Sequence, residues 1–130
     1  MGMIELPAGC LLRFRPMKIL AEGGFGAVWL AHQKELERPV AIKVLHANVL
    51  TDDTAVQRFV NEAKITAQLA HPNIVVLIDH DVEDGVPWIA YEYVTGASLR
   101  VRLKAGPLRW TDACEIACLV CAALEEAHAR

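Results

Sequence analysis

The stretch that decides the fold is a glycine-rich turn followed by two spaced charged residues. It reads Leu20-Ala21-Glu22-Gly23-Gly24-Phe25-Gly26-Ala27-Val28 and is followed by Val40-Ala41-Ile42-Lys43, with Glu62 nineteen residues beyond Lys43. A glycine turn between two strands, a lysine on a strand and a carboxylate on a helix can together surround the phosphates of a nucleotide. The order and spacing of these groups therefore predict a phosphate-binding cradle.

The apolar pattern on either side of the turn predicts strands over residues 14–22, 27–31 and 40–45. The third strand alternates cleanly, so that its residues should face two opposite sides of a sheet. One side would carry Val40, Ile42 and Val44, and the other would carry Ala41, Lys43 and Leu45. A lysine on such an apolar strand either extends to water or binds an anion.

Residues 51–70 predict a helix, for which Thr51 or Asp52 offers an N-cap oxygen. Apolar and small residues recur on one face at helical spacing, namely Phe59, Ala63, Thr66 and Ala70. Glu62 lies at the edge of that inward face. The helix should end at His71-Pro72, because proline disfavours helical geometry in the residue before it.

The rest of the chain predicts strands over 74–78 and 87–93, a short helix over 99–104 and a final helix from Thr111 to the C-terminus. The final helix is apolar on nearly all sides. Such a helix is typical of a core, where neighbours cover every face. We therefore expect the chain to be the front part of a larger assembly or to need a partner.

Composition excludes several classes of function. The 130 residues carry a net charge of -3, which does not favour nucleic acid or an anionic membrane as a partner. No apolar run approaches the roughly 20 residues that span a bilayer, and the N-terminus does not resemble a secretory signal. The expectation is a cytoplasmic protein with reduced thiols and no membrane segment.

Three cysteines have a spacing that some iron–sulfur enzymes use. Cys114, Cys118 and Cys121 lie at i, i+4 and i+7 of the final helix, so they share one of its faces. A triplet that binds a cluster normally lies on a loop. We therefore interpret these cysteines as small core residues, and we expect no metal site on them or on the histidines.

The chemistry of the glycine turn can be narrowed by elimination. No Gly-Lys-Ser/Thr closes it, so it is not a Walker loop. Val28-Trp29-Leu30 continues as a strand where a dinucleotide fingerprint needs a helix. Together with the Val40–Lys43 stretch and Glu62, the turn resembles the N-terminal lobe of a protein kinase, with its GxGxxGxV, VAIK and helix-C glutamate.

The resemblance extends from about Phe14 to Arg130. Leu6-Pro7-Ala8-Gly9, the Gly23–Gly26 turn and His71-Pro72-Asn73-Ile74-Val75 look most like bacterial serine/threonine kinases of eukaryotic type. The resemblance implies an α+β fold with a five-stranded antiparallel sheet, helix C and the first helices of the second lobe. It divides the chain into a leader (1–13), a kinase N-lobe and hinge (14–94) and the start of a helical C-lobe (95–130).

In this family the strand-3 lysine holds the α- and β-phosphates of ATP, and the helix-C glutamate pairs with it. The resemblance assigns these two catalytic roles to Lys43 and Glu62. Tyr91 would be the gatekeeper, and the Glu92 carbonyl and Val94 backbone would meet adenine. The nucleotide contacts that the resemblance implies are Leu20, Ala21, Glu22, Gly23, Gly24, Phe25, Gly26, Val28, Ala41, Lys43, Tyr91, Glu92 and Val94.

Two departures from the family pattern matter. Ala21 replaces the first glycine of the loop, which should stiffen it mildly. The catalytic-loop aspartate and asparagine, the DFG aspartate that binds Mg²⁺ and the activation loop are absent from the 130 residues. Without them, phosphoryl transfer lacks nucleophile positioning and most of its charge neutralisation, so we expect these residues to be inactive alone.

Two functions are therefore open. The first is the ATP-binding portion of a serine/threonine kinase that transfers the γ-phosphate to hydroxyls of a protein substrate. The second is a non-catalytic kinase-lobe module that binds a partner protein, such as another kinase, through its helix-C and last-helix surfaces. The retained Lys43 and Glu62 favour the first function, because a lobe used only for binding need not keep them.

Overall fold

The computed structural model describes residues 5–130 and divides into two compact units. The first unit comprises the chain up to Ala67 together with Val76–Tyr93, and the second comprises Gln68–Val75 and Val94–Arg130. The first four residues of the predicted leader lie outside the described part of the chain. All of the strands belong to the first unit.

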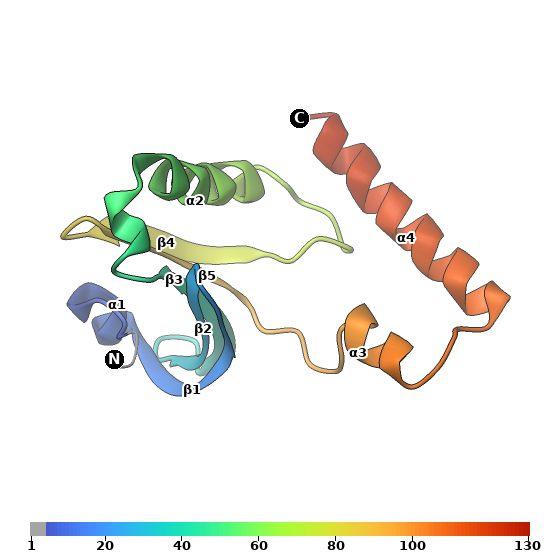
Figure 1. Ribbon diagram of the computed structural model, residues 1–130, viewed down its shortest axis with the longest axis horizontal. Helices are drawn as coiled ribbons and strands as arrows, with labels where there is room; N and C mark the ends of the chain where they lie inside the picture. Colours follow the sequence, from blue (N-terminus) through green and yellow to red (C-terminus); the bar gives the residue numbers. More distant parts are fainter. Residues whose placement is uncertain (1–4) are drawn as a thin grey trace. The chain divides into compact units, whose positions relative to one another are not determined.

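The first unit is built on a five-stranded antiparallel sheet (Figure 1). Its strands are β1 (Phe14–Glu22), β2 (Gly26–Gln33), β3 (Arg38–Leu45), β4 (Leu77–Glu83) and β5 (Val86–Glu92), in the spatial order β1-β2-β3-β5-β4. The predicted fold class, an α+β arrangement on five antiparallel strands, is confirmed.

The fourth strand differs from its prediction. The apolar run predicts a strand over 74–78, whereas β4 begins at Leu77 and continues through polar residues to Glu83. Asp84 and Gly85 form a tight turn with positive φ angles of 50° and 77°, and this turn returns the chain into β5. The hairpin partner therefore sets the bounds of β4, because backbone pairing with β5 offsets the low strand propensity of its polar residues.

Helix α2 (Asp53–Ala67) follows a 3-10 turn, η1 (Val49–Thr51), and lies beside the sheet (Figure 1). The Asp52 carboxylate caps it, since Oδ1 accepts bonds from the backbone N–H of Thr54 and Ala55 at 3.0 and 3.2 Å. The helix ends three residues before the predicted limit. Phe59 and Ala63 are buried, as the helical stripe predicts.

The two faces of the sheet contribute to different clusters. One face of β3 and β5 joins Phe14 in the larger cluster, which includes Val40, Ile42, Val44, Trp88 and Ala90. The other face packs Leu45 and Ile89 against Phe59 and Ala63 of α2. This division follows from the alternation of side chains along a strand, and it confirms the two predicted faces of β3.

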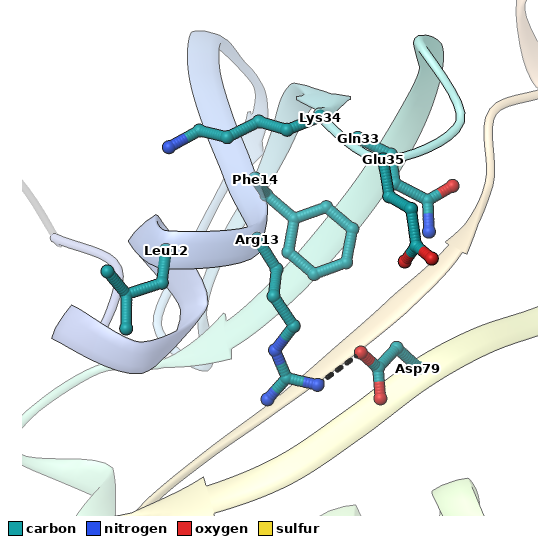
Figure 2. Close-up of a pocket in the computed structure, with 7 residues that line it drawn as sticks. All are labelled: Leu12, Arg13, Phe14, Gln33, Lys34, Glu35 and Asp79. Atoms are coloured by element: carbon teal, nitrogen blue, oxygen red, sulfur yellow. Dashed lines mark hydrogen bonds and ion pairs between the residues drawn. The ribbon is translucent and has the colours of Figure 1, made fainter.

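A short helix that the sequence pattern did not predict, α1 (Ala8–Arg13), precedes the sheet. Its Cys10 is fully buried and Leu6 before it is 6% exposed. Arg13 and Phe14 line a cavity of about 340 Å³. Figure 2 shows the Arg13 guanidinium reaching Asp79 of β4. The cavity is lined by Leu12, Arg13, Phe14, Gln33, Lys34, Glu35 and Asp79.

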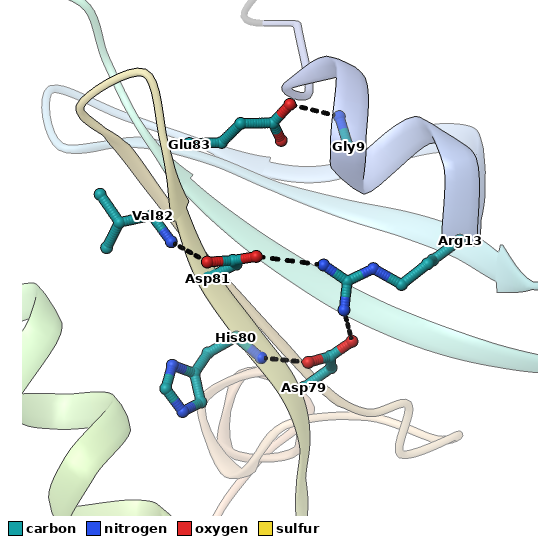
Figure 3. Close-up of polar contacts among 7 residues, drawn as sticks. All are labelled: Gly9, Arg13, Asp79, His80, Asp81, Val82 and Glu83. Atoms are coloured by element: carbon teal, nitrogen blue, oxygen red, sulfur yellow. Dashed lines mark hydrogen bonds and ion pairs between the residues drawn. The ribbon is translucent and has the colours of Figure 1, made fainter.

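Polar contacts attach α1 to the β4–β5 hairpin (Figure 3). The Gly9 backbone N–H donates to Glu83 Oε1 at 2.6 Å, and Arg13 pairs with Asp79 at 2.5 Å and with Asp81 at 3.3 Å. Helices this short are marginal in isolation, so tertiary contacts stabilise α1. Pro7 at its N-cap position makes no side-chain capping bond, so the sequence lacks the start signal that Ser98 gives to α3.

The second unit contains α3 (Leu99–Lys104) and α4 (Trp110–His128). Ser98 caps α3 by accepting a bond from the Val101 N–H, and the Asn73 side-chain amide donates to the Leu119 carbonyl oxygen at 2.9 Å. Within residues 5–130, no helix is long and apolar enough to cross a membrane.

Helix α4, whose apolar pattern predicts a need for neighbours on every face, is left uncovered in the described chain, and the interpretation of its cysteines as core residues is wrong. No residue of α4 is buried, and Leu119, Val120 and Leu124 are 47–50% exposed. Cys114, Cys118 and Cys121 are free and exposed rather than core residues. An apolar pattern identifies side chains suited to burial, but it does not identify what covers them.

Candidate functional site

An ion pair joins β3 to α2. The Lys43 ammonium nitrogen lies 3.1 Å from Glu62 Oε2, and the two side chains are 29% and 40% exposed. The pair is therefore half-buried and open to solvent on one side. A cation held in this way can still approach a second anion, because the carboxylate orients it without enclosing it.

Strand register explains why these residues meet. Lys43 lies opposite Val28 of β2 and Ile89 of β5, so all three side chains share one face of the sheet. Helix α2 packs against this face through Phe59 and Ala63. Glu62 adjoins Ala63 at the edge of the buried stripe, and its carboxylate therefore reaches back to the strand.

Glu62 has a second partner that the sequence did not predict. The Tyr91 hydroxyl donates to Glu62 Oε1 at 2.5 Å, while Lys43 occupies the other carboxylate oxygen. Burial raises the pKa of Tyr91 above its ordinary value, and the adjacent Glu62 carboxylate raises it further. Tyr91 therefore keeps its proton at neutral pH and acts as a donor. Only the pairing of β3 with β5 could have indicated this contact.

The glycine turn joins β1 to β2 as a tight hairpin. The Gly23 N–H donates to the Gly26 carbonyl at 3.0 Å, and the His46 N–H donates to the Phe25 carbonyl at 2.8 Å. Gly26 has a φ of +154°, and a Cβ atom there would lie 2.8 Å from Leu45 Cα. Glycine is therefore required at residue 26 by the close approach of the end of β3.

Two aromatic rings flank the Lys43 ammonium group. Its nitrogen lies 5.6 Å from the ring centroid of Phe25 and 5.7 Å from that of Phe59. Phe25 belongs to the glycine turn and is 39% exposed, whereas Phe59 is 4% exposed. The turn and α2 thus each place an aromatic face beside the cation.

The predicted adenine contacts have different surroundings. Val28 and Ala41 are half-buried on the same face as Lys43, and Leu20 and Ala21 lie exposed near the end of β1. Glu92 ends β5, and its Oε1 accepts a bond from the Val76 N–H at 2.9 Å. The remaining predicted residues of the turn, Glu22, Gly23 and Gly24, are exposed. Val94 belongs to the second unit and is 63% exposed.

No metal site is formed by the described residues. Within residues 5–130, no group of three or more His, Cys, Asp or Glu side chains could hold a metal ion. The 340 Å³ cavity beside Arg13 is lined by none of the predicted site residues. The arrangement that can do chemistry is therefore the cation of Lys43, its carboxylate partner and the backbone of the glycine turn.

Comparison with known proteins gives consistent matches over most of the chain. The family model described as protein tyrosine and serine/threonine kinase matches residues 14–130. Serine/threonine-protein kinase pkn3 of Myxococcus xanthus is 37% identical over 118 residues, and PrkC of Bacillus subtilis is 36% identical over 117 residues. Each alignment covers 89% of this chain, but 22% and 18% of the respective relatives.

Solved structures agree with this result. A crystal structure of the Mycobacterium tuberculosis PknI kinase domain matches with a TM-score of 0.79 and 29% identity, covering 91% of this chain and 48% of that domain. A double mutant of the same domain, C20A_R136A, matches all of this chain with a TM-score of 0.78. The chain spans about a fifth of the curated relatives' length and about half of the solved kinase domain.

Proposed function

The chain belongs to the protein tyrosine and serine/threonine kinase family, and we propose that residues 14–94 form the ATP-binding lobe and hinge of a serine/threonine kinase. Residues 95–130 would begin the helical lobe. The observation that carries the proposal is the ion pair of Lys43 with Glu62, at 3.1 Å, on the sheet face next to the glycine turn. Both groups keep the spacing that the family uses.

The residues present fit the triphosphate of ATP. Lys43 presents a cation with three donors, of which the structure assigns one to Glu62. The glycine turn is exposed from Ala21 to Phe25, so phosphate oxygens would reach its backbone, although the Gly23 N–H already donates to the Gly26 carbonyl. Lys43 would hold the α- and β-phosphates, and Glu62 would keep the ammonium group aimed at them.

The adenine ring would lie against apolar side chains of the same face. Val28 and Ala41 are half-buried there, and each offers a small surface on which a flat ring can pack. Tyr91 and the backbone of Glu92 follow at the end of β5. ATP supplies the transferable phosphoryl group, and these residues bind and orient it.

Mg²⁺ accompanies ATP in this family, but the described residues do not fit it. Since no group of acidic, histidine or cysteine side chains in residues 5–130 could hold a metal ion, we assign none of them to Mg²⁺. Phosphoryl transfer to protein hydroxyls is accordingly proposed for the kinase to which this lobe belongs. We propose that these 130 residues bind nucleotide without transferring phosphate.

The proposal is tested by titrating the chain with a fluorescent ATP analogue such as mant-ATP. Lys43→Met should weaken the affinity at least about tenfold, because charge-assisted contacts of an ammonium with phosphate contribute roughly 1.5–3 kcal/mol. Lys64→Met is the matched control, since Lys64 is an exposed lysine on α2 outside the pair. Equal affinities for both variants, or no saturable binding by the unmodified chain, would contradict the proposal.

A second candidate function is a non-catalytic module that binds another protein. The exposed apolar residues of α4, including Leu119, Val120 and Leu124, favour it. A chain that binds no nucleotide but remains folded and monomeric would support this alternative. Saturable ATP binding that depends on Lys43 would support the first function.

A further inference from the structure

The Glu62 carboxylate is held by two groups from two different strands. Oε2 accepts from Lys43 of β3 at 3.1 Å, and Oε1 accepts from the Tyr91 hydroxyl of β5 at 2.5 Å. Each carboxylate oxygen therefore has its own donor. The carboxylate bridges the two strands, and a rotation about its χ3 angle would break both contacts.

Register places Tyr91 where it can make this contact. Tyr91 lies opposite Ala41 of β3 and opposite Leu77 of β4, and Lys43 lies opposite Ile89. Residues paired across strands, and residues two apart on one strand, share a face. Tyr91 and Lys43 therefore both lie on the sheet face that packs against α2.

The two side chains differ in how firmly they are fixed. The Tyr91 ring packs against the cluster formed by Leu45, Phe59, Ala63 and Ile89. Glu62 is 40% exposed and has three rotatable bonds, so its free side chain would sample several rotamers. A packed phenol is thus a fixed point to which a mobile carboxylate can be attached.

We propose that Tyr91 is a positioning residue that holds the Glu62 carboxylate toward Lys43 before nucleotide binds. The proposal deepens the proposed function and rests on it, since the lysine is oriented for the phosphates of ATP. The role of Tyr91 belongs to its hydroxyl. The ring can also border the adenine, so the two contributions are separated by removing the hydroxyl alone.

The raised pKa of Tyr91 is consistent with this role. A phenol that ionised near neutrality would repel Glu62, whereas burial and the carboxylate itself keep the proton on the oxygen. The hydrogen bond to an ionised acceptor is of the strong, charge-assisted type.

The test is Tyr91→Phe, which keeps the ring and deletes the donor. The first measurement is the rate at which a small acylating reagent modifies Lys43, followed by peptide mass spectrometry in the absence of nucleotide. The amine must leave the carboxylate before it can attack, so a loosened Glu62 should raise the rate about threefold to tenfold. The affinity for mant-ATP should fall by a similar factor.

Tyr93→Phe is the matched control, because the protein has two tyrosines and Tyr93 lies two residues further along the chain. It should leave both the Lys43 modification rate and the mant-ATP affinity within about twofold. Modification of the exposed Lys64 in the same samples reports any general loosening of the fold.

A double-mutant cycle separates positioning from general structural support. If Tyr91 acts through Glu62, Tyr91→Phe should have no further effect in a Glu62→Ala background, because the group that it positions is gone. An effect of the same size in both backgrounds would overturn the proposal. So would an unchanged rate of Lys43 modification in Tyr91→Phe alone.

The two proposals fail in different ways. If the unmodified chain binds no ATP analogue, the proposed function is wrong. The Lys43 modification rates are measured without nucleotide and still decide whether Tyr91 holds Glu62. If the chain binds nucleotide but the cycle shows no coupling, the proposed function stands and the role of Tyr91 is overturned.

Discussion

The Lys43 ammonium nitrogen lies 5.6 Å from the ring centroid of Phe25, a residue of the glycine turn. The cation thus has an aromatic neighbour from the turn as well as one from α2, Phe59, at 5.7 Å. Both rings lie at a similar distance from the Lys43 nitrogen, but Phe25 is exposed and Phe59 is buried. Their contributions to the stability of the fold can therefore be separated by mutation.

Phe59→Ala should destabilise the fold far more than Phe25→Ala. Phe59 is 4% exposed, and deleting a buried phenylalanine costs about 3–5 kcal/mol because of lost burial and the cavity left behind. Phe25 is 39% exposed, so its deletion should cost less than about 1 kcal/mol. Urea unfolding followed by circular dichroism measures both values, and equal costs would contradict the burial difference.

Gly26→Ala should destabilise the chain by about 2 kcal/mol or more, because a Cβ there meets the backbone of Leu45 and His46 at 2.8 and 2.9 Å. Gly24→Ala is the matched control from the same turn, since a Cβ at residue 24 has no atom within 4 Å. Thermal unfolding should leave Gly24→Ala near the unmodified protein. A similar loss in both variants would show that the turn as a whole, rather than the contact with β3, requires glycine.

Cys10 should be the one slow thiol of the native protein. The other three cysteines are exposed, whereas Cys10 is fully buried and burial raises its pKa to about 12. At pH 8, a thiol reagent such as DTNB should therefore modify three cysteines rapidly and the fourth only on unfolding. Rapid reaction of all four thiols in the folded protein would contradict the burial of Cys10.

The same pKa shift predicts how stability depends on pH. Because the thiol ionises near 9.0 when unfolded and near 12 when folded, only the unfolded state loses this proton between those values. The free energy of unfolding should fall as pH rises above 9. Cys10→Ala should make the free energy of unfolding depend less steeply on pH between pH 9 and 10. Tyr91, whose pKa is also raised in the folded state, adds a similar pH dependence only at higher pH. Urea unfolding at several pH values measures the slope, and an unchanged slope would contradict the assignment.

Arg13→Ala should lower the free energy of unfolding by about 1 kcal/mol. The ion pairs of Arg13 with Asp79 and Asp81 are exposed and screened, so they contribute little. Its guanidinium also lies 5.0 Å from the ring centroid of the buried Trp88, and this contact adds to the loss. Arg15→Ala, an exposed arginine on β1, should cost less than about 0.5 kcal/mol. The difference should shrink in high salt without vanishing, since the contact with the ring remains. Denaturant unfolding at two salt concentrations tests this.

The sequence predicted those elements whose signals are local. The bounds of β1 and α3 agree with the expectations for residues 14–22 and 99–104, because the glycine turn ends β1 and Ser98 caps α3. The position of Glu62 at the edge of the stripe formed by Phe59 and Ala63 also follows from helical periodicity alone. The family was likewise recognisable from the spacing of the glycine turn, Lys43 and Glu62.

Elements that depend on distant partners were missed or misplaced. Helix α1 is stabilised by Glu83 and Asp79, more than sixty residues away. The bounds of β4 are set by its pairing with β5, and the cover of α4 cannot be inferred from its apolar pattern. None of these relations leaves a periodic signal within its own segment.

By itself, the sequence determined the kinase-like order of a glycine turn, a strand lysine and a helix glutamate, because each is encoded by residue type and local periodicity. Only the tertiary structure decided that Tyr91 shares the Glu62 carboxylate with Lys43. That contact requires the register in which Ala41 lies opposite Tyr91, and register arises from the pairing of strands far apart in the chain.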